Sequence, residues 1–390
     1  MKNIFIIFSI IFFLFIFSIG FVSAQQNGDV EELFNKGNEL ASLDKYQEAI
    51  EWYDKVLEIE PNHVNALSDK GVVLERMGNY TEAIELYDQA LKVEPDNAVL
   101  LYNKGASLFF LDKYQEAIDL YDKILDFDLR LVNVSHNKGL ALSNLDKYQE
   151  AIEWYDKALE INPNHVDALF QKGNAFFYLG KYQEAIEWYD KALEINPNHI
   201  STLSNKGLTL HNLGKYQEAI KWHDKALEVE PNYFYALYNK GNAFLDLGKY
   251  QEAIEWYDKA LEVELNHVYV LIDKGVALSN LGKYQEAIEW YDKALEVEPN
   301  DGTTLYNKGN AFFDLGKYQE AIEWYDKALE VEPNAVDALT NKGIAVSNLG
   351  KYQEAIGWFD KALEIESNNS DTLSAKEKTL SILNSTNNIN

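Results

Sequence analysis

Apolar residues recur at helical spacing twice within residues 302–335, and a polar break separates the two runs. The first run occupies one face of a helix: Leu305, Gly309, Phe312 and Leu315. The second run has the same period: Tyr318, Ala321, Ile322, Tyr325, Ala328 and Leu329. Between them, Gly316 suits the left-handed conformation that ends a helix, and Pro333 cannot continue a helical hydrogen-bond ladder. The pattern therefore predicts two helices and two turns in this segment.

The same pattern returns every 34 residues along most of the chain. Ten glycines share one phase of this period, as do ten tyrosines from Tyr46 to Tyr352, all seven prolines and all eight tryptophans. No unit could bury both of its apolar stripes alone, so stacked neighbours must bury them together. The period divides residues 30–369 into ten units: 30–63, 64–97, 98–131, 132–165, 166–199, 200–233, 234–267, 268–301, 302–335 and 336–369.

A further apolar pattern follows the last unit. Leu373, Leu380 and Leu383 predict one more helix over residues 370–383, which covers the end of the core as terminal caps do in repeat arrays. Residues 384–390 are expected to be disordered.

The units resemble the tetratricopeptide repeat family. In 302–335 the residues that carry the resemblance are Leu305, Gly309, Tyr318, Ala321, Tyr325, Ala328 and Pro333. The resemblance implies an all-α fold, a right-handed α-solenoid (superhelix) of stacked antiparallel helix pairs in which the first helix of each pair lines a concave groove. One departure is the lysine before each periodic glycine, from Lys36 to Lys342, where the family usually has an apolar residue. Helical spacing places this lysine beside the core and away from the groove, so we expect its ammonium to reach water.

Residues 1–24 have the pattern of a secretory signal peptide. Lys2 is followed by an almost wholly apolar run, and small residues end at Ala24. The alternative is an uncleaved anchor helix, because the apolar run is long enough to span a bilayer. Both interpretations place the remaining chain on the outer side of the membrane, so we expect an exported protein, secreted or in the cell envelope. Four Asn-x-Ser/Thr sequons are candidate glycosylation sites: Asn79, Asn133, Asn368 and Asn384.

The chain has 63 acidic and 35 basic side chains, a formal net charge of −28. This charge repels nucleic acid and anionic membranes, so we expect no nucleic-acid partner and membrane attachment only through an uncleaved N-terminal segment. Most acids lie opposite the apolar stripe of the second helix of each unit, where they are expected to form a solvated convex face. The alternative is a surface that gathers divalent cations or basic partners.

No motif indicates a catalytic, metal or cofactor site. The chain has no cysteine, which excludes zinc–thiolate sites, iron–sulfur clusters, disulfides and thiol catalysis. Its seven histidines form no recognisable catalytic or metal-binding spacing. We therefore expect no enzyme activity and no cofactor.

The residues expected to face the groove alternate between odd and even units. Position 5 of a unit is aromatic in most odd units and smaller in most even ones, and position 9 is asparagine in most odd units and aliphatic in even ones. An alternative origin of this double period is duplication of a two-unit gene segment without selection for binding. The predicted ligand-binding groove contains thirteen residues: Tyr102, Phe109, Phe170, Asn174, Phe177, Tyr178, Tyr235, Tyr238, Asn242, Tyr269, Tyr306, Asn310 and Phe313.

Aromatic rings and amides on one surface suit an extended peptide, and such rings are uncommon on proteins without a partner. We therefore predict a non-enzymatic, exported interaction scaffold that binds a peptide or protein segment in its concave groove. The side chains of Phe170, Phe177 and Tyr238 are expected to lie off the core stripes. A glycan stacked on the same rings is one alternative. Another is a structural spacer or cell-surface assembly module that uses the acidic convex face or the ends of the array.

Overall fold

The computed structural model describes residues 29–128 and 131–387, with side chains to residue 385. The predicted signal peptide, residues 1–24, and residues 388–390 of the predicted tail lie outside the described residues. The chain forms two compact parts, which meet between Ile195 and Asn196, and each is described by itself.

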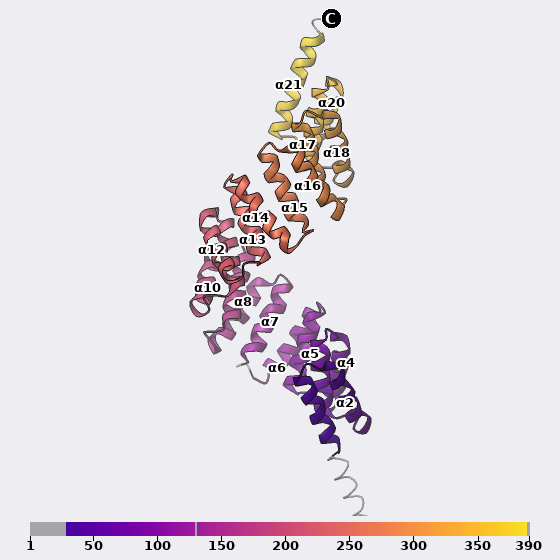
Figure 1. Ribbon diagram of the computed structural model, residues 1–390, viewed down its shortest axis with the longest axis vertical. Coiled ribbons are helices and arrows are strands. Elements are labelled where there is room, and N and C mark those ends of the chain that lie inside the picture. Colours follow the sequence, from indigo (N-terminus) through magenta and orange to yellow (C-terminus); the bar gives the residue numbers. More distant parts are fainter. Residues whose placement is uncertain (1–28, 129–130, 388–390) are drawn as a thin grey trace, which may run out of the picture. The chain divides into compact units, whose positions relative to one another are not determined.

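Every regular element in the described part of the chain is a helix (Figure 1). In the first part, a helical segment over residues 29–42 precedes α2 (Tyr46–Ile59), α3 (Val64–Arg76), α4 (Tyr80–Val93), α5 (Ala98–Phe110), α6 (Tyr114–Leu125), α7 (Val132–Asn144), α8 (Tyr148–Ile161), α9 (Val166–Tyr178) and α10 (Tyr182–Ile195). The second part contains α11 (Ile200–Asn212), α12 (Tyr216–Val229), α13 (Phe234–Asp246), α14 (Tyr250–Val263), α15 (Val268–Asn280), α16 (Tyr284–Val297), α17 (Gly302–Asp314), α18 (Tyr318–Val331), α19 (Val336–Asn348), α20 (Tyr352–Ile365) and α21 (Ser370–Asn387).

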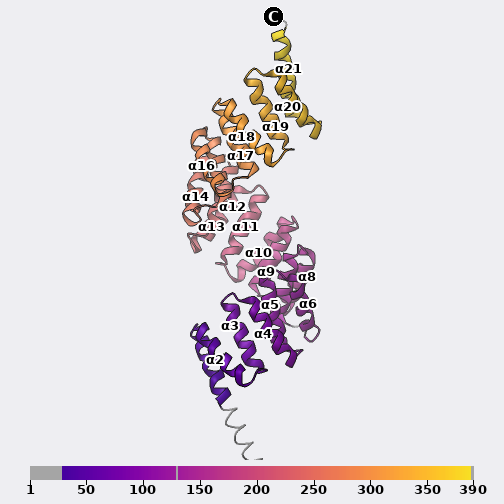
Figure 2. The ribbon, with the colours of Figure 1, turned by 90° about the vertical axis from the view of Figure 1, so that its right-hand side faces the viewer.

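The helices form two layers within each part (Figure 2). Within each part, an odd-numbered helix packs on the even-numbered helix that follows it and also contacts the next odd-numbered helix of that part, as α13, α15 and α17 do. Successive even-numbered helices such as α16 and α18 have no Cα atoms within 8 Å of one another in the described residues. The more closely spaced layer is the inner one of a curved stack. We call the two surfaces the odd-helix face and the even-helix face.

The turn inside each pair is a left-handed residue, as predicted. Gly316 has φ of 74° between α17 and α18. In three early units an aspartate takes this conformation, with φ of 57–58° at Asp44, Asp112 and Asp146. Aspartate tolerates this region because its short carboxylate can bond locally, and the hydroxyl of Tyr46 donates to Asp44 Oδ1 at 2.6 Å.

A contact between a ring and bare backbone holds each pair together. A Cβ atom at Gly241 of α13 would lie 2.5 Å from Cε1 of Tyr257 in α14, whose side chain is fully buried. The same contact recurs through the described pairs, with His223 facing Gly207 and Phe359 facing Gly343 in place of a tyrosine. Only glycine leaves room for a ring at this distance, so the periodic glycines are required by packing.

The last helix, α21, differs from the prediction. It ends at Asn387, so the first four residues of the segment 384–390, expected to be disordered, are helical. Its buried side chains are Thr372 and Thr379, whereas Leu373 is 39% exposed. The reason is register: α21 continues the odd-numbered layer, and its threonines occupy the buried positions 3 and 10 of a first helix. Thr372 Oγ1 accordingly lies 2.7 Å from Thr340 Oγ1 of α19.

Substitution of two helical glycines tests the ring-to-backbone contact. We expect Gly241→Ala to lower the free energy of unfolding by about 1–3 kcal/mol, because the added methyl overlaps the buried ring of Tyr257. Gly357→Ala is the matched control, since no atom lies within 4 Å of a Cβ at this exposed site in α20. It should stabilise by about 0.5–1 kcal/mol through helix propensity alone. Urea unfolding followed by circular dichroism measures both, and shifts of the same sign would contradict the packing argument.

Candidate interaction surfaces

From the unit 132–165 onward, the lysine before each periodic glycine is buried. Lys308 of α17 has 5% of its side chain exposed, and its Nζ pairs with Oδ1 of Asp292 in α16. The expectation that this ammonium reaches water is therefore wrong, because the carboxylate of the preceding unit takes the place of water. The same ion pair recurs at Lys138–Asp122, Lys172–Asp156, Lys240–Asp224, Lys274–Asp258 and Lys342–Asp326.

A tryptophan covers each of these lysines. Nζ of Lys308 lies 3.5 Å from the centroid of the Trp324 ring, and Nζ of Lys327 lies 3.7 Å from it. The indole therefore contacts two ammonium groups, a cation–π arrangement that stabilises both charges.

Two early units show what the tryptophan contributes. Leu86 and Leu120 replace it there, and the side chains of Lys70 and Lys104 are 18% and 21% exposed. In two units with the indole, burial lowers the pKa of Lys172 and of Lys240, although the carboxylate partner of each opposes this shift. The ion pair and the indole together form a Lys–Asp–Trp cluster that joins neighbouring units.

The alternation between odd and even units in the sequence matches a difference in the hydrogen bonds of the buried tyrosines. The hydroxyl of Tyr325 donates to Asn310 Oδ1 at 2.8 Å, and the equivalent bonds in other odd units are Tyr53–Asn38, Tyr189–Asn174 and Tyr257–Asn242. In the even unit 268–301 the Tyr291 hydroxyl lies 3.3 Å from Ser279 Oγ instead. The asparagines predicted to pair with a ligand thus direct a carbonyl oxygen toward the core.

The thirteen predicted groove residues differ in exposure. Tyr178, Tyr235 and Tyr269 are 64%, 61% and 66% exposed. The others are half-buried: Tyr102, Phe109, Phe170, Asn174, Phe177, Tyr238, Asn242, Tyr306, Asn310 and Phe313. Five of these pack against buried clusters: Tyr102, Phe109, Tyr238, Tyr306 and Phe313. The expectation that Tyr238 lies off the core is wrong, because buried core residues pack against part of its ring.

Six aromatic residues gather where α13 and α15 begin. This α13–α15 aromatic cluster consists of Tyr233, Phe234, Tyr235, Tyr238, His267 and Tyr269. Its ring centroids are 4.6 Å apart for Phe234 and His267, 5.6 Å for Phe234 and Tyr235, and 5.9 Å for His267 and Tyr269. The two exposed tyrosines of the cluster, Tyr235 and Tyr269, are therefore linked through buried and half-buried rings. The sequence analysis found three of the six residues and missed Tyr233, Phe234 and His267.

A carboxylate lies beside this cluster. The hydroxyl of Tyr238 donates to Oδ2 of Asp273 in α15 at 2.7 Å. Burial raises the pKa of Asp273 to about 6, and the hydrogen bond from Tyr238 opposes that shift. The arrangement combines rings for apolar or cationic side chains with a carboxylate that accepts hydrogen bonds.

The first part of the chain has a separate pair of exposed rings. Tyr178 at the end of α9 stacks on Tyr148 of α8 at 5.1 Å, and Phe110 at the end of α5 stacks on Tyr80 of α4 at 4.9 Å. Phe110 is 61% exposed and was missed by the sequence analysis. It lies at position 13 of its unit, as Tyr178 does, so the repeat phase could have identified it.

Hollows on the odd-helix face lie elsewhere than predicted. One of about 220 Å³ lies between the segment 29–42 and α3, where Tyr46, Asp69 and Arg76 line it. Another of about 430 Å³ lies between α19 and α21, where Tyr352 and Lys378 line it. Neither of these two hollows is lined by a predicted groove residue.

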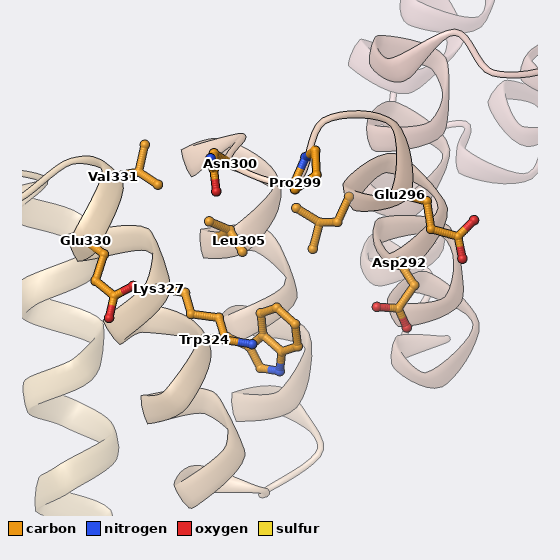
Figure 3. Close-up of a pocket in the computed structure, with 10 residues that line it drawn as sticks. Asp292, Glu296, Pro299, Asn300, Leu305, Trp324, Lys327, Glu330 and Val331 are labelled. Carbon is orange, nitrogen blue, oxygen red and sulfur yellow. The ribbon is translucent and has the colours of Figure 1, made fainter.

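The larger hollows lie on the even-helix face (Figure 3). Between α16 and α18 the groove has a volume of about 940 Å³. A groove of about 570 Å³ lies between α12 and α14. The sequence analysis predicted a solvated acidic surface here and no groove.

Other features predicted from the sequence can be placed. The four sequon asparagines are exposed: Asn79, Asn133, Asn368 and Asn384. The described residues contain no group of three or more acidic or histidine side chains able to hold a metal ion. Among the helices of residues 29–128 and 131–387, none is long and apolar enough to span a bilayer.

Comparisons with family descriptions match most of the array. One family model of the tetratricopeptide repeat matches residues 303–335 and 336–369. A second model of this repeat matches residues 198–263 and 232–300. The description "Anaphase-promoting complex, cyclosome, subunit 3" matches residues 42–124 and 144–222. A comparison with curated proteins found no match.

Several solved structures share the fold. The Cut9–Hcn1 hetero-tetramer of the APC/C is 16% identical, with a TM-score of 0.52, and the match covers 90% of this chain and 76% of that chain. A tetratricopeptide repeat protein from Parabacteroides merdae ATCC 43184 is 21% identical, with a TM-score of 0.51 and coverage of 64% and 98%. PilW, described as a type IV pilus biogenesis factor, is 21% identical, with a TM-score of 0.50 and coverage of 54% and 97%.

The helix pairs and the stacked core define an α-solenoid repeat protein. The chain belongs to the tetratricopeptide repeat family, and its helices fit about ten repeats. Members of this family bind protein or peptide partners, and the fold is generally non-enzymatic. The chain is accordingly a protein-interaction scaffold.

One buried histidine makes stability depend on pH. His223 takes the place of the tyrosine in its unit, and neither ring nitrogen has a hydrogen-bond partner in the described residues. Burial, with His211 and Lys240 nearby, lowers its pKa to about 3. The unfolded chain binds a proton at this residue below pH of about 6.5, whereas the folded chain does not. Stability is therefore lost as the pH falls below that value, by about 2 kcal/mol at pH 5.

His223→Tyr should remove this loss, since tyrosine takes up no proton in this range. We expect the difference between urea midpoints at pH 7 and pH 5 to be smaller in the variant than in the original chain. An unchanged difference would show that other groups, such as His136, account for the acid sensitivity.

Proposed function

We propose that this scaffold binds an extended segment of a partner protein on its odd-helix face. The α13–α15 aromatic cluster is the observation that supports this proposal most strongly. Its exposed rings, Tyr235 and Tyr269, are 61% and 66% accessible to water, and exposed aromatic groups of this kind commonly mark interaction surfaces.

The chemistry of the cluster favours a peptide. Linked rings contact apolar side chains of a segment that lies across α13 and α15. Asp273, beside Tyr238, accepts hydrogen bonds from backbone or side-chain donors of that segment. The half-buried asparagines contribute less than the sequence suggests, because their carbonyl oxygens already accept bonds from buried tyrosines.

The proposal also includes export. Residues 1–24 have the charged, apolar and small-residue regions of a signal peptide, which supports a location of the scaffold on the outer side of a membrane. The partner is then a protein of the cell envelope or its surroundings.

Truncation of the two exposed rings tests the binding surface. We expect Tyr235→Ala with Tyr269→Ala to weaken capture of the envelope partner at least tenfold, since central aromatic side chains contribute about 2 kcal/mol each at interfaces. Both rings are exposed, so helical content and the unfolding midpoint should change little. The measurement is quantitative pull-down from native envelope extract with immobilised residues 25–390, which include every described helix.

Glu323→Lys on the even-helix face is the control, and it should alter mainly salt dependence. Protease treatment of the extract separates the alternatives. Loss of the captured species after treatment identifies a protein, whereas capture that survives and is competed by sugars identifies a glycan. Undiminished capture by the double tyrosine variant would contradict the proposed surface.

The export proposal has its own test. We expect the mature chain to begin at Gln25, because cleavage follows Ala24 in the signal-peptide pattern. Mass spectrometry of the N-terminus from the native source measures this. Retention of Met1 or Lys2 on a membrane-bound chain would establish the anchor alternative, and the same chain recovered from the cytoplasm would contradict export.

A further inference from the structure

The grooves on the even-helix face exist because successive even-numbered helices are held apart. The groove between α16 and α18 has Leu305 of α17 and Trp324 at its base, and its walls carry Glu296 and Glu330 (Figure 3). The groove between α12 and α14 has the same construction two repeats earlier. Its lining residues occupy the same unit positions: Asp224, Leu227, Glu228, Pro231, Asn232, Leu237, Trp256, Lys259 and Glu262.

The groove between α16 and α18 is lined by more acidic than basic side chains. Asp292 is paired with the buried Lys308, but neither Glu296 nor Glu330 forms an ion pair with another described residue. Lys327 is the one basic residue that lines the groove between α16 and α18. Two carboxylates without ion-pair partners therefore border a groove whose base is leucine and indole.

The indole already holds a cation that a partner could replace. Trp324 contacts two ammonium groups, of which that of Lys308 is buried and that of Lys327 is exposed. The exposed lysine can leave the ring without breaking the ion pair that joins the units. An arginine is the better occupant of that face, because its planar guanidinium stacks on aromatic rings and its fork pairs with carboxylates.

Charge complementarity selects among the possible occupants. Nucleic acid and anionic lipid are repelled by the glutamates, and a second copy of this chain carries the same net charge of −28. An apolar segment alone would bury Glu296 and Glu330 without partners. A segment with both basic and aliphatic side chains satisfies the walls and the base together.

We propose that the two even-helix grooves bind a partner segment in which arginine alternates with aliphatic residues. Arginine pairs with the wall glutamates and stacks on Trp256 or Trp324, while the aliphatic side chains contact the leucines at the base. This surface is separate from the aromatic cluster on the odd-helix face, so the scaffold holds two partners of different chemistry.

The probe is a fluorescein-labelled ten-residue peptide of alternating arginine and leucine, titrated with residues 25–390 and followed by fluorescence anisotropy. A variant carrying Glu228→Gln, Glu262→Gln, Glu296→Gln and Glu330→Gln should bind the peptide about fivefold or more weakly, since each groove loses two carboxylates. The matched control removes the same charge from exposed sites on the same four helices that line neither groove: Glu218→Gln, Glu255→Gln, Glu289→Gln and Glu323→Gln. It should weaken binding by about twofold or less.

A second comparison tests the indole. Lys259→Ala with Lys327→Ala frees one ring face in each groove and should tighten binding of the peptide. The control is Lys249→Ala with Lys317→Ala, which removes the same charge from sites outside the grooves. Equal effects of the test and control variants in both comparisons would overturn the proposal, because only bulk charge would then matter. Tyr235→Ala with Tyr269→Ala should leave this peptide bound, so failure here is distinguishable from failure of the odd-helix surface.

Discussion

A tyrosine ring against bare backbone is the contact on which the rest of this array depends. Because a Cβ atom at Gly241 would lie 2.5 Å from the Tyr257 ring, position 8 must be glycine and position 24 must carry a flat side chain. The ring then buries a hydroxyl that needs a partner, and an asparagine at position 9 supplies one in most odd units. The 34-residue period and part of the double period thus follow from one close approach between two helices.

The Lys–Asp–Trp cluster stabilises the contact between neighbouring units, as the contact between tyrosine and glycine stabilises the helix pair within one unit. A buried ammonium is costly unless it is paired, and Lys308 has both a carboxylate and an indole face. Leu120 shows the consequence of removing the indole, since Lys104 in that unit is four times as exposed as Lys308, 21% against 5%. The ion pair requires an aspartate on each second helix, and this requirement explains part of the acidic net charge of the chain. From composition alone, these acids would be assigned to the solvated surface.

Much of the fold could be predicted from the sequence, because repetition multiplies a weak helical signal. The two helices of each unit, the left-handed residue at Gly316 and the burial of Tyr325 follow from spacing and residue type. The candidate surface was harder to predict. Helical geometry places Tyr306 on the groove side of its own helix, but Asn341 of the next unit donates to its hydroxyl at 3.0 Å and covers it. Helical periodicity describes one helix at a time, so it could not predict that Asn341 of the next unit covers Tyr306.

The even-helix grooves depend on a property that no single unit contains, the distance between neighbouring second helices. Their residues are nearly the same in each unit, whereas the exposed rings of the odd-helix face change from Tyr178 in one unit to Tyr235 and Tyr269 in others. A varied surface can distinguish one partner sequence from another, since each unit presents different side chains. A repeated surface distinguishes only spacing and charge. The two faces of this scaffold are therefore suited to different tasks, selective binding on the odd-helix face and retention of regular basic segments on the even-helix face.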